Sequence, residues 1–312
     1  MASSIFQHMH NIDRRWIYLV LTITLVISII VAKPVKPKVL DSVQAMYDTV
    51  ENAPANPGDG KLVLLGMTFS PSTMGENGNQ ARVLIRHLML SHKRFAIISA
   101  GEFQGAILGP MIVSDLAKQY HYQYGVDWIS FGFQPNAMGF YTSFPRDIPG
   151  TIQTDGVNHQ PLAKYPIMKG IKTMRDNIAL FIDITASNSA FNWVEVVQGR
   201  YGLKIGYACT GVMAAEAYPY LDSGQFFGMM PGIKGAADYE LLVDRKEAQQ
   251  YRDGKITHMY KPNMGAEIVI TPARKLMFTQ NIAHLVILLF IIIGNVGLLL
   301  ARRAKSRAQE EA

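Results

Sequence analysis

Carboxylates that interrupt or follow short apolar runs are the residues of this 312-residue chain best suited to chemistry. Asp183 stands inside the apolar run Ile178–Thr185, where a carboxylate must be hydrogen-bonded, paired or placed near an exposed end. Glu76 and Glu102 each come shortly after another apolar run. We predict these three as candidates for acid–base chemistry. For Asp183 we favour the alternative, a structural pairing with a nearby Lys or Arg.

Hydroxyl and amide side chains leave the ends of the same runs and form a second set, suited to a small polar ligand. In an open parallel sheet, ligands bind outside the carboxyl ends of the strands. The alternative is that these side chains only cap the helices that follow. The predicted ligand-binding residues are Ser70, Ser72, Thr73, Asn77, Gln104, Thr185, Ser187, Asn188 and Thr210.

Several familiar motifs are absent or incomplete in the sequence. The first turn has Gly75 and Gly78 but neither GxGxxG nor GxxxxGK[ST], so nucleotide binding is not predicted. The single cysteine, Cys209, lies in GYACTG, which departs from the GxSxG elbow, and we expect a buried thiol. His87 and His92 do not share a helix face and no HExxH occurs, so we predict no metal site and no cofactor.

The elements that must position these residues follow from the hydrophobic pattern. Nearly continuous apolar runs predict strands buried on both faces at Leu62–Phe69, Phe95–Ala100, Asp127–Phe133, Ile178–Thr185 and Leu203–Cys209. Helical periodicity predicts helices at Asn79–Lys93, Gly105–Tyr124, Ser189–Tyr201 and Gly211–Leu221. This alternation predicts an α/β fold with a doubly wound, mainly parallel sheet, Rossmann-like or flavodoxin-like. A Pro- and Gly-rich insertion, 134–165, is expected to be a lid or a docking loop.

Two stretches without any Asp, Glu, Lys or Arg, Trp16–Ala32 and Ile282–Ala301, predict transmembrane helices at the two ends of the chain. A cleaved signal peptide is the alternative for the first, but its apolar run is long for one. The second contains Gly294, Asn295 and Gly297. Small residues and a polar amide at membrane depth predict packing against another membrane subunit or a second copy of the chain.

Basic residues beside the two spans predict the topology. Both short tails carry such residues, at Arg14, Arg15, Arg302, Arg303, Lys305 and Arg307, which favours a cytoplasmic position for both ends and an extracytoplasmic position for the middle. Lys33, Lys36 and Lys38 follow the first span and favour the opposite orientation, but long domains translocate largely regardless of their charge. The basic residues lie beside the membrane or are dispersed, so the net charge of +6 points to the lipid bilayer and not to nucleic acid. The expected segments are tail 1–15, span 16–32, spacer and first helix 33–60, α/β domain 61–245, polar excursion 246–281, span 282–301 and basic tail 302–312.

Three parts of the sequence resemble a known group of proteins: Ala217–Leu242, the preceding Arg200–Gly202, and the residues IAHL that open the last span. Together they resemble a group of prokaryotic two-span membrane proteins with an outer α/β domain and uncharacterised function. The resemblance covers most of the chain from Leu62 onward. It implies an ordered turn at Gly232–Gly235 before a final helix, and it implies no activity or cofactor.

Three functions are compatible with these features. The leading hypothesis is a non-catalytic envelope subunit, anchored in the cytoplasmic membrane, whose α/β domain is a scaffold for other proteins. The second is a small-molecule-binding domain that uses the crevice at the strand ends. The third is a membrane-tethered enzyme that uses the crevice carboxylates. The short tails leave no room for a cytoplasmic output domain.

Overall fold

The computed structural model describes residues 13–135, 138–262, 265 and 270–310. They divide into two units, one made of the segments up to Val35 and from Lys275 onward, the other of Lys36–Arg274. Parts of four predicted segments, the tails 1–15 and 302–312, the insertion 134–165 and the excursion 246–281, lie outside the described residues.

The first unit is built on two apolar helices, α2 (Arg14–Val31) and α13 (Ala273–Glu310). Asp13 caps α2 by accepting a hydrogen bond from the Arg15 N–H at 2.9 Å. Both helices are long and apolar enough to cross a membrane. With 38 residues at a rise of about 1.5 Å each, α13 is longer than the roughly 30 Å hydrocarbon layer requires. It continues beyond the predicted span at both ends.

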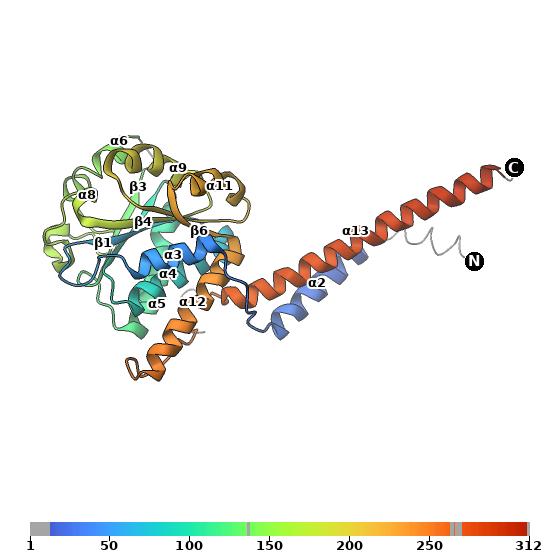
Figure 1. Ribbon diagram of the computed structural model, residues 1–312, viewed down its shortest axis with the longest axis horizontal. Helices are drawn as coiled ribbons and strands as arrows, with labels where there is room; N and C mark the ends of the chain where they lie inside the picture. The colour runs from blue at the N-terminus through green and yellow to red at the C-terminus, as the bar shows by residue number, and fades with distance from the viewer. Residues whose placement is uncertain (1–12, 136–137, 263–264, 266–269, 311–312) are drawn as a thin grey trace. The chain divides into compact units, whose positions relative to one another are not determined.

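The second unit contains one sheet of six parallel strands within the described residues, in the order β3-β2-β1-β4-β5-β6 (Figure 1). The predicted α/β class with a parallel sheet is confirmed. The strands are nearly continuous in apolar residues because helices cover both faces. Their bounds are β1 (Leu62–Thr68), β2 (Phe95–Ala100), β3 (Trp128–Gln134), β4 (Ile178–Thr185), β5 (Ile205–Cys209) and β6 (Phe226–Pro231).

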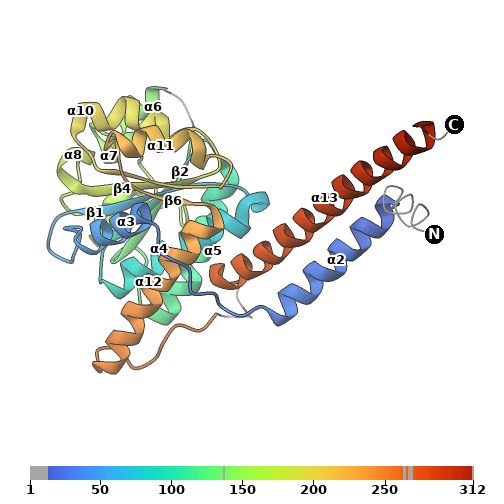
Figure 2. The same cartoon turned by 45° about the vertical axis from the view of Figure 1, so that its right-hand side comes forward.

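Helices flank this sheet on its two sides (Figures 1 and 2). One side holds α3 (Asp41–Glu51), α4 (Asn79–Leu90), α5 (Phe103–Tyr120) and α12 (Gly232–Arg252). The other holds α6 (Met138–Ser143), α9 (Ser189–Trp193) and α11 (Ala214–Asp222). The shorter helices are α7 (Ile148–Thr151), α8 (Met174–Asn177) and α10 (Gly199–Tyr201), with single turns η1 (Pro71–Thr73), η2 (Met74–Gly78), η3 (Leu162–Lys164), η4 (Pro166–Met168) and η5 (Val194–Gln198).

Close packing on the sheet depends on two glycines. A Cβ at Gly105 would lie 1.7 Å from the Met67 carbonyl oxygen, so only glycine lets α5 approach β1 this closely. A Cβ at Gly66 would lie 2.2 Å from Asp183 Oδ1 on the neighbouring strand β4. Gly66 therefore makes the space that the Asp183 carboxylate occupies.

The sixth strand corrects the prediction from the sequence. β6 was missed because FFGMMP ends in Pro, a residue that is depleted in strands. The ordered turn expected at Gly232–Gly235 is also wrong, because α12 begins at Gly232 itself, with φ +54°. Gly235 already belongs to this helix and packs against the backbone of Met230.

The insertion 134–165 is held by buried side chains. Phe140, Tyr141 and Phe144 pack against Trp193 in the core, which includes Phe181 of β4. Near the other end of the insertion, the Asp155 carboxylate accepts hydrogen bonds from the Asn158 and Gln160 N–H groups and from the Tyr124 and Tyr165 hydroxyls. Burial alone would raise the pKa of Asp155, but these hydrogen bonds lower it to about 2.

Candidate functional site

The order in which the chain adds strands to the sheet reverses between β1 and β4. From β1 the chain proceeds outward to β2 and β3, then returns to β4 and proceeds the other way to β5 and β6. Ligands of open parallel sheets bind at such a point, outside the carboxyl ends of the strands. Thr68 pairs with Thr185 in the register, so the two strands end side by side. We call these two strand ends and their following residues, 69–78 and 186–189, the switch point.

Asp183 lies just below the switch point and is completely buried, at 0% exposure. Its Oδ2 accepts a hydrogen bond from Ser189 Oγ at 2.6 Å, and its Oδ1 accepts one from Thr68 Oγ1 at 3.2 Å. Burial raises its pKa to about 6, against the opposing effect of these hydrogen bonds. The expected Lys or Arg partner is wrong, since in the described part of the chain no ion pair involves Asp183. The hydrogen-bond donors described for Asp183 are both hydroxyls.

Three hydroxyls above Asp183 form what we call the hydroxyl triangle. The Oγ atoms of Thr185 and Ser187 are 2.9 Å apart, those of Ser189 and Thr185 3.1 Å, and those of Ser187 and Ser189 3.3 Å. Thr185 and Ser189 are buried, whereas Ser187 and the following Asn188 are exposed. The triangle thus connects the buried carboxylate with the surface.

The loop after β1 supplies further polar groups to the switch point. Ser70 and Ser72 pair their hydroxyls at 2.7 Å, and Thr73 Oγ1 donates to the Ser70 carbonyl. Asn77 is fully buried and donates from Nδ2 to the Thr185 carbonyl at 3.3 Å, which links the two strand ends. No hydrogen-bond partner is found for its Oδ1 among the residues described.

The other predicted site residues bond locally or to β5. Glu76 Oε2 accepts from the Gly211 N–H at 2.7 Å, next to the buried Thr210 at the end of β5. Glu102 caps α5, and its Oε1 accepts from the Gln104 N–H at 3.2 Å. Gln104 is bonded to Glu102 at the start of α5, and the Glu102 carbonyl also accepts from Ser99 Oγ near the end of β2. Each of the three candidate carboxylates therefore accepts its hydrogen bonds from a different set of donors.

Cys209 and the other singled-out residues add no reactive group. The Cys209 thiol is buried, and burial raises its pKa to about 12, which disfavours the nucleophilic thiolate. Within the described ranges no group of three or more His, Cys, Asp or Glu side chains could hold a metal ion. On α13, Gly294 and Asn295 are exposed and Gly297 is buried.

A groove of about 380 Å³ lies beyond the end of β3, and we call it the β3-end groove. Large apolar side chains beside it are exposed: Phe103 at 61%, Ile107 at 50% and Phe133 at 41%. The rings of Phe103 and Phe133 meet edge to face at a centroid distance of 5.7 Å. The groove is lined by Phe103, Ala106, Ile107, Phe131, Gly132, Phe133, Gln134, Thr154, Asp155, Gly156 and His159.

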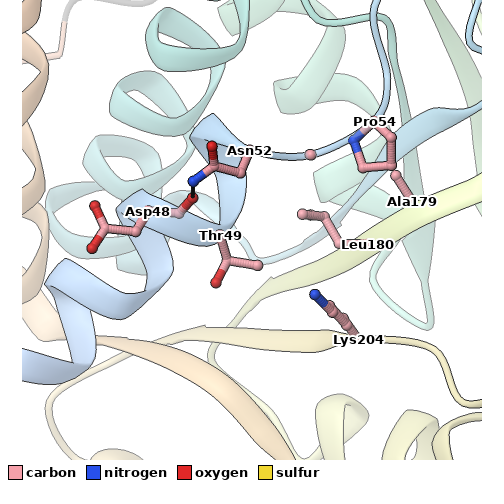
Figure 3. A pocket seen from close by; sticks show the side chains of 8 residues that line it. Asp48, Thr49, Asn52, Pro54, Ala179, Leu180 and Lys204 are labelled. Carbon is pink, nitrogen blue, oxygen red and sulfur yellow. Dashed lines mark hydrogen bonds between the residues drawn. The ribbon is translucent and has the colours of Figure 1, made fainter.

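A second pocket, of about 290 Å³, lies at the opposite, amino-terminal edge of the sheet (Figure 3). It is bounded by the end of α3 and by the first residues of β4, with Lys204 just before β5. Asn52 is used there to donate to the Asp48 carbonyl at 2.8 Å. This pocket contains none of the predicted site residues.

Buried charges also lie between α4 and α12, and we call them the ion-pair layer. Arg82 pairs with Glu240 at 2.8 Å, and Arg86 pairs with Glu247 at 2.8 Å and with Asp244 at 3.1 Å. Beside them, His87 contacts the Tyr239 hydroxyl through Nδ1 and the Glu51 carboxylate through Nε2, each at 2.7 Å. In this layer each buried acid faces a cation.

Ser189 and Thr68 are the site residues that the sequence reasoning missed. The hydrophobic pattern places Ser189 at the start of a helix and Thr68 in a strand, and both placements are confirmed. A signal for Ser189 was present, because hydroxyl residues alternate after Asp183 in DITASNS. Side chains of an extended chain point to the same side at every second residue.

Comparison with known proteins assigns the chain to no family. No family model, no curated protein and no solved structure matches it. The resemblance of Ala217–Leu242 to two-span prokaryotic proteins therefore stays a prediction.

Proposed function

We propose that the chain is a membrane-anchored, non-catalytic docking subunit of a membrane protein complex. Its α/β domain is Rossmann-like and extracytoplasmic, and both ends of the chain are cytoplasmic. The order of the parallel strands, with its reversal between β1 and β4, supports the Rossmann-like assignment. The two apolar helices α2 and α13 support the anchoring.

The exposed apolar side chains at the β3-end groove are the observation that carries the docking function. Phe103, Ile107 and Phe133 expose aromatic and aliphatic surface beside one groove, whereas other exposed apolar side chains of the domain, such as those of Val212 and Met138, do not line it. Contiguous exposed apolar patches mark interaction sites, whereas single exposed residues need no explanation. Aromatic anchors beside a concavity are the usual centre of a protein–protein interface.

The state of the carboxylates supports docking over acid–base catalysis. Glu76 accepts from the Gly211 N–H, Glu102 caps its own helix, and Asp183 is bonded to two hydroxyls. An acid–base pair would need two such groups within reach of one substrate.

The docking function is tested by purification of the full chain from native membranes in a mild detergent. The test variant is Phe103→Ser/Ile107→Ser/Phe133→Ser, and the control is Tyr251→Ser, which alters a half-exposed ring on α12. We expect a protein that co-elutes with the parent and the control, and is lost from the triple variant. A parent chain that elutes alone, or partners that are equally retained by all three, would contradict docking through this groove.

The topology is tested separately with protease added to spheroplasts. The positive-inside rule, applied to Arg14, Arg15, Arg302 and Arg303, predicts that the segment between the two spans is digested and both ends are protected. Protection of the central segment would reverse the orientation. It would leave the docking experiment unaffected.

A further inference from the structure

We propose that the hydroxyl triangle of Thr185, Ser187 and Ser189 is a binding site for a hard divalent cation, Mg²⁺ or Mn²⁺, with Asp183 as the compensating charge beneath it. The cation site stands independently of the docking function, because it depends on none of the groove residues.

The spacing of the three oxygens fits one face of a coordination octahedron. Mg²⁺ binds oxygen at about 2.0–2.1 Å in octahedral geometry, which places neighbouring ligand oxygens about 2.9 Å apart. The triangle has edges of 2.9, 3.1 and 3.3 Å, so small side-chain adjustments complete the face. Hydroxyl oxygens with a carboxylate are the hard donors that such ions prefer.

The charge balance points the same way. Asp183 is fully buried, and among the residues described its hydrogen-bond donors are the neutral hydroxyls of Ser189 and Thr68. A buried charge normally has a partner of opposite sign or coordinates a metal. Glu240 and Glu247, the buried acids of the ion-pair layer, each have an arginine at 2.8 Å. A cation on the triangle would supply the missing charge through the Ser189–Asp183 contact.

Two further observations fit the proposal. Ser187 and Asn188 are exposed, so an ion can reach the triangle from solvent. Asn77, which is bonded to the Thr185 carbonyl, is fully buried and has an amide Oδ1 without a hydrogen-bond partner in the described part of the chain. An unsatisfied buried oxygen calls for a water or an ion nearby.

The single carboxylate predicts weak binding with retained water. Mg²⁺ usually keeps several waters and takes only one or two protein carboxylates. In calcium sites, where ligand charge tunes the affinity, the weakest dissociation constants are about 10⁻⁴–10⁻³ M, and we expect the triangle to bind in that range. The outward positions of the octahedron are then open to water or to an oxygen of a bound molecule.

Mn²⁺ titration of the chelator-treated full chain in a non-ionic detergent tests the site, with electron paramagnetic resonance to measure free Mn²⁺. We expect one saturable Mn²⁺ per chain that excess Mg²⁺ displaces. Ser187→Ala should weaken binding by at least about tenfold, the loss typical of a perturbed metal site. Asp183→Asn should weaken it at least as much.

Ser223→Ala is the matched control, since Ser223 is also an exposed hydroxyl and follows α11. It should bind Mn²⁺ like the parent. No saturable binding by the parent, or parental affinity in Ser187→Ala, would overturn the proposal. Ser187 is exposed, so its variant decides the question even if Asp183→Asn fails to fold.

Discussion

The switch point and the ion-pair layer differ in whether a buried carboxylate has a cationic partner. In the ion-pair layer, the buried Arg82 and Arg86 face Glu240 and Glu247 at 2.8 Å. Just below the switch point, Asp183 is equally buried and, among the described residues, accepts hydrogen bonds from hydroxyls alone. A paired charge can be explained by the stability and specificity of the fold. A buried charge without a partner destabilises the folded state, and no interaction within the fold compensates for that cost. Such a charge therefore indicates a functional site.

Removal of one partner from the ion-pair layer should cause the largest change in the free energy of unfolding. Arg86→Leu leaves Glu247 buried without its cation and also removes the stacking of the guanidinium on the Tyr260 ring, 4.2 Å from its centroid. We expect a loss of about 3–5 kcal/mol in the free energy of unfolding, measured by urea denaturation. Arg86→Leu/Glu247→Leu should recover most of it. A loss below about 1 kcal/mol in the single variant would remove the contrast with the switch point.

Removal of the buried charge below the switch point should not lower the free energy of unfolding, in contrast to Arg86→Leu. Asp183→Asn removes a buried charge while the side-chain oxygen can still accept from Ser189 or Thr68. We expect unchanged stability or a gain of up to about 2 kcal/mol in metal-free buffer, because a buried unpaired charge is costly. A loss of more than about 2 kcal/mol would mean that the carboxylate is a structural group, like those of the ion-pair layer.

The contacts of His87, beside the ion-pair layer, should make the free energy of unfolding depend on pH. Burial lowers the pKa of His87, against the opposing hydrogen bond to Glu51. As pH falls below about 6.5, the unfolded chain gains a proton that folded His87 does not, so stability falls, by up to about 1.4 kcal/mol per pH unit. The groups that face His87 are Glu51, Tyr47, Tyr239, Lys246 and Lys93.

Urea denaturation between pH 7 and pH 5 measures this slope. Because the hydrogen bond from His87 holds the pKa of Glu51 well below its usual range, Glu51 loses its own contribution only at more acidic pH. His87→Gln should flatten the slope, and His258→Gln, which alters an exposed histidine, should leave it unchanged. Equal slopes in the parent and His87→Gln would show that His87 titrates normally.

An exposed ion pair should have the smallest effect. Lys255 and Asp253 are 3.8 Å apart, with 69% and 38% of their side chains exposed. Lys255→Ala should change the free energy of unfolding by less than about 0.5 kcal/mol in the same urea experiment. A larger loss would mean that burial does not explain why ion pairs of this domain differ in their contribution to stability.

The sequence was sufficient for the elements whose pattern is local. Five of the strands stand out as apolar runs, and the polar residues at their ends follow from the same pattern. β6 did not stand out, because it contains Pro231 and proline is depleted in strands. The ion pair between Arg82 and Glu240 joins residues 158 positions apart, and no local pattern reveals such a contact.

The candidate site was predicted as a set of residues and not as an arrangement. Asp183, Thr185 and Ser187 were all selected, but their geometry depends on the packing of β4 beside β1. The sequence also could not reveal that no Lys or Arg of the described residues pairs with Asp183, because Lys and Arg residues are distributed throughout the chain.

Anomalous diffraction from crystals of the full chain soaked in Mn²⁺ tests the central claim most directly. A cation that compensates Asp183 should give a peak within about 2.5 Å of the Thr185 and Ser187 hydroxyl oxygens. A well-ordered triangle with no peak at saturating Mn²⁺ would contradict it, and Asp183 would then be a buried carboxylate stabilised by hydroxyls alone.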